Sequence, residues 1–427
     1  MSESHKETVP VDTESRDVVV GSPGPSADSA DRRAKLLLIA AVILLLVVFG
    51  WLAPFSSFPQ SYDLNVYRNG GVAVAHGGDP YSEPPHYVGP YFTYPPFAAV
   101  AFTPLTLVPL GVDRVLVTIV SLACVVLLAL LSVRAERPAR LGDQSLWTVV
   151  LAAAAIGLLL EPVRSTLGFG QINLLLAVLV VADLVPRRRA LPQGVLIGVA
   201  AGMKLVPALF VVYLLLTHRL RAAAWAAGTF AATVAIGFAV MPAAAGKYWT
   251  RYVFETARAG PTGYVGNQSL RAVLTRLMGD SDHVRTAWVV LSVLALMAGL
   301  WIAVRLHSRD RELAAICAVA LTGLLVSPIS WQHHWVWALP IAVLLLVGGD
   351  TAGRRGWATV GVLWCLFFCE APIWWVANPF APAPRSGWRM LATNSYVLAG
   401  VAMLFALGVL ARRIDAHSQL RSPPRQL

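Results

Sequence analysis

Residues 115–140 read VLVTIVSLACVVLLALLSVRAERPAR, an apolar run that is followed at once by Arg134, Arg137 and Arg140. A helix of about 20 apolar residues crosses the hydrocarbon core of a bilayer. Arg and Lys gather at the cytoplasmic ends of such helices. The stretch therefore predicts a membrane-spanning helix that ends in the cytoplasm.

The same alternation of apolar runs and basic clusters continues along the chain. Apolar runs lie near 111–133, 146–160, 171–186, 222–241, 286–306, 313–328, 335–348, 356–376 and 390–411. Further basic clusters are Arg187 to Arg189; His218, Arg219 and Arg221; Arg305, Arg309 and Arg311; Arg354 and Arg355; and Arg412 and Arg413. Each cluster is expected in the cytoplasm, and the runs supply the crossings between clusters. The sequence predicts an all-α polytopic protein of the plasma membrane.

Composition supports this class and excludes others. Of the 427 residues, 57% are hydrophobic and only 13% are charged, about half the charge of a soluble domain. The net charge of +11 is spread between apolar runs rather than gathered on one face, so it does not indicate nucleic-acid binding. Cys124, Cys317, Cys365 and Cys369 all lie in apolar stretches and are expected to be small core residues rather than disulfides or metal ligands.

The ends of the chain and its loops divide as follows. Leu36 to about Ala53 follows Arg32, Arg33 and Lys35 and has no convincing cleavage site, so we expect an uncleaved first membrane helix with a cytoplasmic N-terminus. Residues 1–31 have the composition of a disordered cytoplasmic tail. The expected transmembrane domain covers 32–413, with outer loops at 54–96, 242–285 and 377–389, and a second cytoplasmic tail covers 414–427.

One interval breaks the regular pattern. Ala190 to Thr217 holds about 28 residues between two basic clusters, too few for two crossings of about 20 residues each. Lys204 and Pro207 lie midway along it. Broken backbone at membrane depth must line a protein cavity, so we expect two short helices that form a hairpin with Lys204 near its tip. Counting both halves gives about 12 membrane segments.

Polar residues that lipid contact cannot explain fall near the expected outer ends of the helices. They are Asp63, Tyr67, Tyr94, Glu161, Arg164, Gln171, Asn173, Asn267, Gln268, His333 and His334. Such groups usually face an interior cavity where they bind or react. The sequence therefore predicts one polar cavity that opens to the outer face.

Three of these positions leave alternatives open. Asp63 is a candidate proton acceptor, or the cap of a short interfacial helix. Lys204 requires an anion, because an unpaired buried ammonium is costly; the anion is either Glu161 or Asp183, or a bound phosphate. Of His333 and His334, either one faces the cavity or both belong to an interfacial aromatic belt with the neighbouring tryptophans.

The motifs resemble those of glycosyltransferase family 87, the polyprenol-phosphate-mannose-dependent mannosyltransferases of mycobacteria and their relatives, in the GT-C class. The matching pieces are residues 63–67 (DLNVY), 92–97 (FTYPPF), 161–166 (EPVRST), 170–173 (GQIN), 203–207 (MKLVP), 267–269 (NQS) and 327–337 (SPISWQHHWVW). Their order and their common expected location on the outer face make the set specific. The likeness is greatest to the α-1,2-mannosyltransferases that extend phosphatidylinositol mannosides beyond the tetramannoside.

The resemblance implies a GT-C fold and assigns roles to the residues above. Asp63 matches the acidic residue of the family, a general base that deprotonates the acceptor hydroxyl while mannose leaves a lipid phosphate with inversion. His334 or His333, Lys204 and Arg164 are candidates for the developing phosphate charge. The sugar-binding candidates are Tyr67, Tyr94, Glu161, Gln171, Asn173, Asn267 and Gln268.

The implied partners are a polyprenyl-phosphate mannose donor, a phosphatidylinositol mannoside acceptor and membrane lipids, with no nucleic acid. The first loop has no Asp-Asp or Glu-x-Asp pair, so we expect no metal and no other cofactor. Lipomannan or lipoarabinomannan as acceptor, and arabinose as the sugar, stay open, because cavity shape decides them. A flippase or transporter is the alternative from another class, although the sequence shows neither an internal repeat nor a second broken hairpin.

Overall fold

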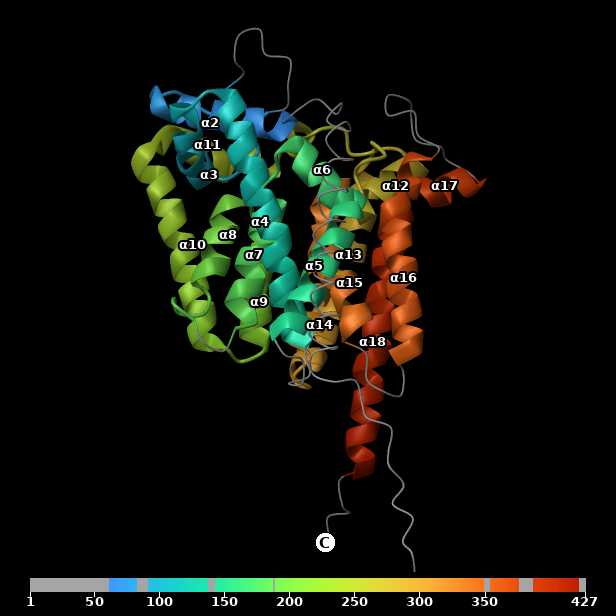
Figure 1. Ribbon diagram of the computed structural model, residues 1–427. Helices are drawn as coiled ribbons and strands as arrows, with labels where there is room; N and C mark the ends of the chain where they lie inside the picture. The colour runs from blue at the N-terminus through green and yellow to red at the C-terminus, as the bar shows by residue number, and fades with distance from the viewer. Residues whose placement is uncertain are drawn as a thin grey trace, which may run out of the picture.

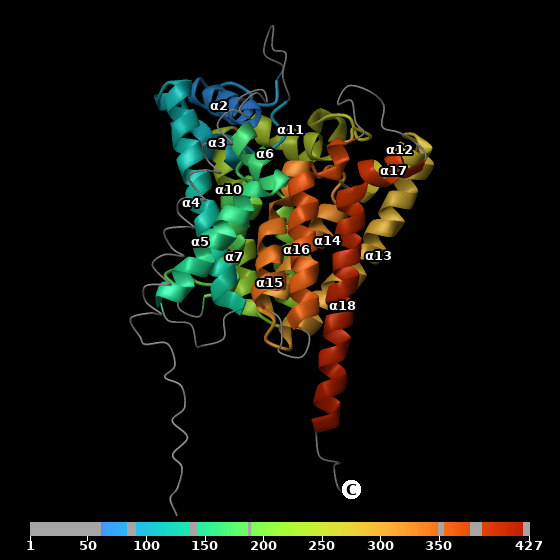
Figure 2. The same ribbon diagram turned by 45° about the vertical axis from the view of Figure 1, so that its right-hand side comes forward.

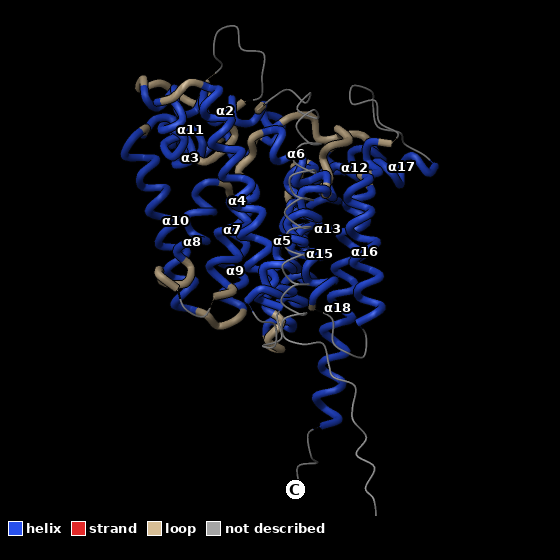
Figure 3. The backbone as a smooth tube through the Cα atoms, in the orientation of Figure 1, coloured by secondary structure: helices blue, strands red, loops and turns tan. Residues whose placement is uncertain are grey.

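The computed structural model describes residues 61–82, 91–136, 143–186, 189–348, 354–375 and 387–421. The predicted N-terminal tail over 1–31 and the predicted first membrane helix, Leu36 to Ala53, lie outside these residues. So do parts of the outer loops expected at 54–96 and 377–389, and the last residues of the predicted tail over 414–427. The described residues form helices and connecting loops without a strand (Figure 3).

Five helices are long and apolar enough to cross a membrane. They are α4 (Leu110–Glu136), α10 (Leu220–Val240), α13 (Asp282–His307), α16 (Arg354–Glu370) and α18 (Ser395–Arg421). A sixth span arises if α5 (Asp143–Leu159) and α6 (Glu161–Phe169), which are bent by 74° at Leu160, form one crossing. The expectation of an all-α polytopic membrane protein is confirmed, and the number of about 12 segments stays a prediction.

Shorter apolar helices fill the interior between these spans. They are α7 (Asn173–Leu184), α14 (Glu312–Val326) and α15 (Ala338–Val347). Every side chain of α14 from Leu313 to Leu325 is buried. A helix that is apolar on all sides belongs in the middle of a bundle, and α14 packs against α13, α15 and α18. Each of the nine apolar runs in the sequence therefore contains a helix.

The helix ends separate into two groups. The C-terminal ends of α4 and α15 meet the N-terminal end of α14, where Arg311 bonds to Glu136 and to the carbonyl oxygen of Gly348. We call this the basic end. The opposite end carries α2 (Tyr62–Ala75), α3 (Pro96–Phe102), α11 (Pro242–Thr250), α12 (Leu270–Met278) and α17 (Gly387–Thr393), together with α6 (Figures 1 and 2). We call it the site end.

The predicted broken hairpin lies within the bundle. The helix α8 (Val195–Met203) begins at the basic end, where the Asp183 carboxylate accepts hydrogen bonds from the amides of Gly194 and Ile197. After the break at Lys204 and the short 3-10 helix η3 (Val206–Ala208), α9 (Leu209–Leu216) returns to the basic end. There Arg219 pairs with Glu312 at 2.8 Å. Lys204 therefore lies at the turn between the two short helices.

Glycines let α8 lie directly against α10. A Cβ atom on Gly198 would stand 2.5 Å from the carbonyl oxygen of Ala226, and one on Gly202 would stand 2.3 Å from Oγ1 of Thr233. Small residues at such contacts allow membrane helices to approach closely. This packing holds the first half of the hairpin, and therefore Lys204, at a fixed position.

We expect Gly198→Ala to destabilise the protein by about 1–3 kcal/mol, because the added methyl group meets backbone atoms that cannot rotate away. The thermal unfolding midpoint of the detergent-solubilised protein measures the change. Gly228→Ala is the matched control, since Gly228 lies on α10 with nothing within 4 Å of its Cβ position. Equal midpoints for the two variants would contradict the proposed tight packing of α8 on α10.

Candidate active site

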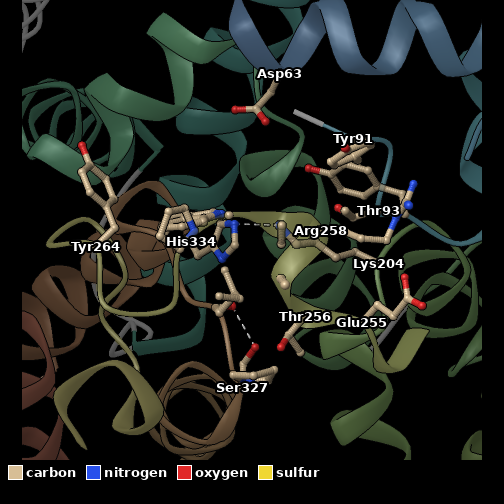
Figure 4. Close-up of a pocket in the computed structure, with 18 of the residues that line it drawn as sticks. Asp63, Tyr91, Thr93, Lys204, Glu255, Thr256, Arg258, Tyr264, Ser327 and His334 are labelled. Atoms are coloured by element: carbon tan, nitrogen blue, oxygen red, sulfur yellow. Dashed lines mark hydrogen bonds between the residues drawn. The ribbon is translucent and has the colours of Figure 1, made fainter. Parts of the chain in front are cut away.

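A cavity of about 1570 Å³ lies at the site end. Its walls come from the start of α2, the loop before α3, the end of α6, the break after α8, the segment from Tyr248 to Asp280, and residues 327–334. Six of the predicted site residues line it: Asp63, Tyr94, Gln171, Lys204, His333 and His334. Figure 4 shows Asp63 on one side of the cavity, with His334 and Lys204 below it. The tertiary structure thus gathers motifs that are up to about 270 residues apart.

Asp63 lies in the first turn of α2, at the rim of the cavity. The N-cap of this helix is Ser61, not Asp63, so the alternative in which Asp63 is the cap is wrong. Burial raises the pKa of Asp63 to about 6, while a hydrogen bond with Gln171 and the positive charge of Lys204 act in the opposite direction. A carboxylate with a pKa near neutrality is suited to accept a proton.

The position of α2 is fixed by its contacts beneath the site. Arg68 bonds to the carboxylate of Asp113 on α4 and donates at 2.8 Å to the carbonyl oxygen of Val108. The Tyr67 ring stacks on Phe102 with 4.3 Å between centroids. Tyr67 is fully buried and lies behind the cavity wall rather than in it. It supports the wall through its hydroxyl group.

Gln171 connects the side of the cavity near Asp63 to the histidines. Its Oε1 accepts a hydrogen bond from the Tyr67 hydroxyl at 2.6 Å, and its Nε2 lies 3.2 Å from the Tyr94 hydroxyl and 3.4 Å from Nε2 of His333. Gly170 precedes it with φ +66°, and a Cβ there would lie 2.9 Å from Cβ of Leu64. Only glycine fits this turn comfortably, and the turn directs Gln171 into the site.

Lys204 and His334 form the base of the cavity. The Lys204 ammonium donates to Oδ1 of Asn173 at 3.0 Å and lies 3.0 Å from Nε2 of His334. It also lies 5.6 Å from the centre of the Tyr94 ring. The predicted pairing with Glu161 or Asp183 is wrong, because Asp183 caps α8 at the basic end and Glu161 bonds elsewhere. No carboxylate forms an ion pair with Lys204 among the described residues.

Both histidines line the cavity, whereas the sequence left open whether one of them faces it or both belong to an interfacial aromatic belt. They lie in the 3-10 helix η6 (Gln332–Trp337) with their rings at 83° to each other and 4.8 Å apart. The carbonyl oxygen of His333 accepts hydrogen bonds from Thr166 at 2.9 Å and from Asn173 at 3.0 Å. The irregular turn explains why both line it, because it lets adjacent side chains reach the same space.

Glu161 and Arg164 lie outside the cavity lining. Glu161 accepts hydrogen bonds from Ser165, from Trp374 at 3.3 Å and from Tyr396 at 2.7 Å. Arg164 donates to the carbonyl oxygen of Cys369 at 3.0 Å. These bonds join α6 to α16 and α18, so the two residues support the wall. The geometry does not place Arg164 at the phosphate or Glu161 at a sugar.

Asn267 and Gln268 also lie within the wall of the cavity and do not line its inner surface. Both are fully buried. Asn267 bonds to the carbonyl oxygens of Thr262 and Pro328 and to the amide of Ser330. Gln268 donates to the carbonyl oxygens of Val265 and Thr393. The Asn267 amide holds residues 328–330 against the segment after α11, and the Gln268 amide joins that segment to Thr393 of α17. Neither side chain lines the cavity, so their assignment to sugar binding stays a prediction.

The sequence analysis missed one side of the cavity. Tyr91, Tyr248, Tyr252, Arg258, Tyr264 and Trp374 line it. Three of them, Tyr252, Arg258 and Tyr264, lie between α11 and α12, where Asn267-Gln268-Ser269 was the one motif recognised. The signal that was available is the density of Tyr and Arg in 247–264, since these residue types are common at binding surfaces. Among the described residues no three His, Cys, Asp or Glu side chains form a group that could hold a metal ion.

Comparisons with known proteins find a family and relatives that cover most of the chain. The family model described as Glycosyltransferase family 87 matches residues 92–328. The polyprenol-phosphate-mannose-dependent alpha-(1-2)-phosphatidylinositol mannoside mannosyltransferase of Mycobacterium tuberculosis is 34% identical over 391 residues, which cover 86% of this chain and 89% of that protein. The corresponding pentamannoside mannosyltransferase of Mycolicibacterium smegmatis is 35% identical over 396 residues, or 89% of this chain and 92% of that protein.

No solved structure matches the chain. The family model covers more than half of the chain, and the two relatives are similar over nearly its full length. The matched region also contains Tyr94, Gln171 and Lys204 of the cavity. The chain therefore belongs to glycosyltransferase family 87.

Proposed function

We propose that this protein transfers mannose from polyprenyl-phosphate mannose to a phosphatidylinositol mannoside, with inversion and formation of an α-1,2 linkage. The observation that carries the proposal is the arrangement of a buried carboxylate, Asp63, and the pair formed by Lys204 and His334 in one cavity. A base and an anion-binding group are the two elements that such a transfer needs. The relatives named above supply the donor, the acceptor and the linkage.

The donor phosphate is proposed to bind at Lys204 and His334. The Lys204 ammonium is held by two neutral groups, Asn173 and His334, so its charge is available to an anionic ligand. When the bond between C1 of mannose and the phosphate oxygen breaks, negative charge develops on the phosphate. Preorganised donors at that charge lower the barrier.

The lipid chain of the donor has a matching apolar space. A narrow hollow of about 50 Å³ lies next to the cavity and shares Lys204 and His334 with it. The other walls come mainly from apolar residues of α7, η3, α9, α14 and η6, among them Leu176, Phe210 and Leu324. A phosphate at Lys204 would place the first isoprene unit at this hollow.

Asp63 is proposed to accept the proton of the acceptor hydroxyl. The oxygen attacks C1 of mannose on the face opposite the phosphate, so a β-linked donor gives an α-linked product. The proton passes to the carboxylate, and the electron pair of the broken bond leaves with the phosphate. A phosphate is already a good leaving group, so no second carboxyl group is needed to protonate it.

The proposed setting is the plasma membrane, with a GT-C fold of about 12 membrane segments and the site end facing outward. Arg219 and Arg311, which lie at the basic end, support this orientation, because such residues stay on the cytoplasmic side. Both termini are then cytoplasmic. The predicted outer loops at 54–96 and 242–285 contain described residues that line the cavity, including Asp63, Tyr91 and Arg258.

The first test compares wild type with Asp63→Asn in lipid, with radiolabelled polyprenyl-phosphate mannose and a mixed phosphatidylinositol mannoside extract. We expect the variant to lose about 10²–10⁴-fold in transfer rate while its unfolding midpoint is retained. Asp79→Asn is the control, because Asp79 lies at the same end and pairs with Lys247 at 3.1 Å. Full activity of Asp63→Asn would remove Asp63 as the base, and donor movement across the bilayer without transfer would favour the flippase.

The rate should depend on pH through Asp63. The base acts in its ionised form, and burial raises its pKa to about 6, so kcat/KM should fall about tenfold per pH unit below about 6 and level off above it. Initial rates between pH 4.5 and 8 at subsaturating acceptor measure this. The residual rate of Asp63→Asn should lack the inflection. An unchanged inflection in that variant would assign it to another group.

Replacing Lys204 should weaken the stabilisation of the donor phosphate. Lys204→Met should lower the transfer rate by about 10²–10³-fold, because a preorganised charge at the phosphate is lost. Lys204→Arg should retain part of the activity. Lys247→Met is the control, since Lys247 is exposed at the same end of the protein. An effect on the acceptor KM alone, with normal donor kinetics, would place the donor phosphate elsewhere.

A further inference from the structure

Two cations besides Lys204 line the cavity, Arg276 and Arg258. Arg276 is buried and its guanidinium donates to Asn394 and to the carbonyl oxygens of Tyr264 and Asn267, whereas Arg258 has fewer bonds.

Arg258 belongs to the 3-10 helix η5 (Thr256–Ala259), in the segment between α11 and α12. Its guanidinium carbon lies 4.5 Å from the centre of the Tyr91 ring and 4.4 Å from that of Tyr252. Figure 4 shows Arg258 beside Tyr91. Two aromatic faces thus orient this guanidinium.

The charge of Arg258 is not neutralised within the part of the protein that the structure describes. Its Nη2 donates to the carbonyl oxygen of Tyr81 at 2.7 Å, and its buried Nε has no hydrogen-bond partner among the described residues. The acidic groups nearby are occupied by other cations. Glu255 bonds to Arg251 at 2.6 Å, and Asp79 bonds to Lys247 at 3.1 Å.

The cavity is large enough for two substrate headgroups. Its volume of about 1570 Å³ exceeds the 300–1,000 Å³ of a usual small-molecule site. Asp63, Lys204 and Arg258 line the same space. A headgroup in which a sugar chain separates an anionic group from the reacting hydroxyl can therefore contact both Arg258 and Asp63.

We infer that Arg258, between Tyr91 and Tyr252, binds the phosphodiester of the acceptor glycolipid. The inference rests on the proposed function, in which each substrate carries one phosphate group. Lys204 and His334 bind the phosphate of the donor, and Arg258 binds the phosphate of the acceptor. An arginine that has no carboxylate partner among the described residues suits a phosphodiester, since a guanidinium offers charge and planar hydrogen-bond donors together.

Two variants separate charge from structure. Arg258→Gln keeps a donor for the Tyr81 carbonyl oxygen and loses the charge, whereas Arg258→Lys keeps the charge. Arg285→Gln is the matched control, because Arg285 in the first turn of α13 is exposed, pairs with the exposed Asp282 and does not line the cavity. Each is assayed with a phosphatidylinositol mannoside and with an alkyl glycoside that carries the same mannose chain but no phosphate.

We expect Arg258→Gln to raise the KM for the phosphate-bearing acceptor about tenfold and to leave kcat, the KM for the neutral acceptor and the KM for the donor unchanged. Arg258→Lys should restore most of the loss, and Arg285→Gln should resemble wild type. Equal losses with both acceptors, or no loss with either, would overturn the inference. In the first case Arg258 supports the wall or binds sugar, and in the second it binds nothing.

A binding measurement keeps this inference separate from the proposed reaction. Native mass spectrometry of the detergent-solubilised protein gives the occupancy by added phosphatidylinositol, with diacylglycerol as the neutral probe. We expect about tenfold weaker binding of phosphatidylinositol in Arg258→Gln and no change for diacylglycerol. If wild type binds phosphatidylinositol through Arg258 yet transfers no mannose, the proposed function fails and the phosphodiester site stands. If wild type transfers mannose but binds phosphatidylinositol no more tightly than Arg258→Gln does, the proposed function stands and the phosphodiester site fails.

Discussion

The Lys204 ammonium lies inside an apolar bundle, and the arrangement of several helices depends on surrounding it with polar groups. A buried cation is costly unless polar groups surround it, and here Asn173 and His334 do so at 3.0 Å each. These residues come from the start of α7 and from η6, so three distant segments must meet at one point. The break after α8, the close packing of Gly198 on α10 and the cap that Asp183 supplies all keep Lys204 there.

The groups that bond to Lys204 are neutral, and its charge acts on the Asp63 carboxylate without forming an ion pair with it; this arrangement has a functional consequence. A carboxylate in place of Asn173 or His334 would form an ion pair with Lys204. That pair would compete with an external anion and weaken its binding. The two carboxylates considered as partners, Glu161 and Asp183, are both committed elsewhere. The structure thus keeps a positive charge at the base of the cavity.

The acid–base side of the site and the anion-binding side are built on different elements and are joined by few contacts. Asp63 lies on α2, which is held by Arg68 to Asp113 on α4. Gln171 reaches Tyr67 and Tyr94 on one side and His333 on the other. Loss of Gln171 would loosen both sides together. Arg258 lies on a third element, so its positive charge lies on a different wall of the cavity from that of Lys204.

The sequence alone determined the class of fold and the pieces of the site. Apolar runs of membrane length, with basic clusters between them, predict membrane-crossing helices, because the backbone in lipid must satisfy its own hydrogen bonds. The interval around Lys204 is too short for two such crossings and therefore predicts a broken hairpin. The sequence singles out four residues of the site because polar groups are costly in apolar surroundings unless they bind or react. These residues are Asp63, Gln171, Lys204 and His334. Only the tertiary structure decided which of the polar residues face the cavity and which bond to the wall.

Glu161, Arg164, Asn267 and Gln268 are as polar as the residues that face the cavity, yet their side chains bond to backbone and neighbouring helices. The sequence cannot distinguish the two cases, because a hydrogen-bond partner from a distant segment has no local signature. The same holds for Arg258, whose neighbours Tyr91 and Tyr252 lie 167 and 6 positions away in the chain. Long-range packing, rather than residue type, sets which charge remains available to a ligand.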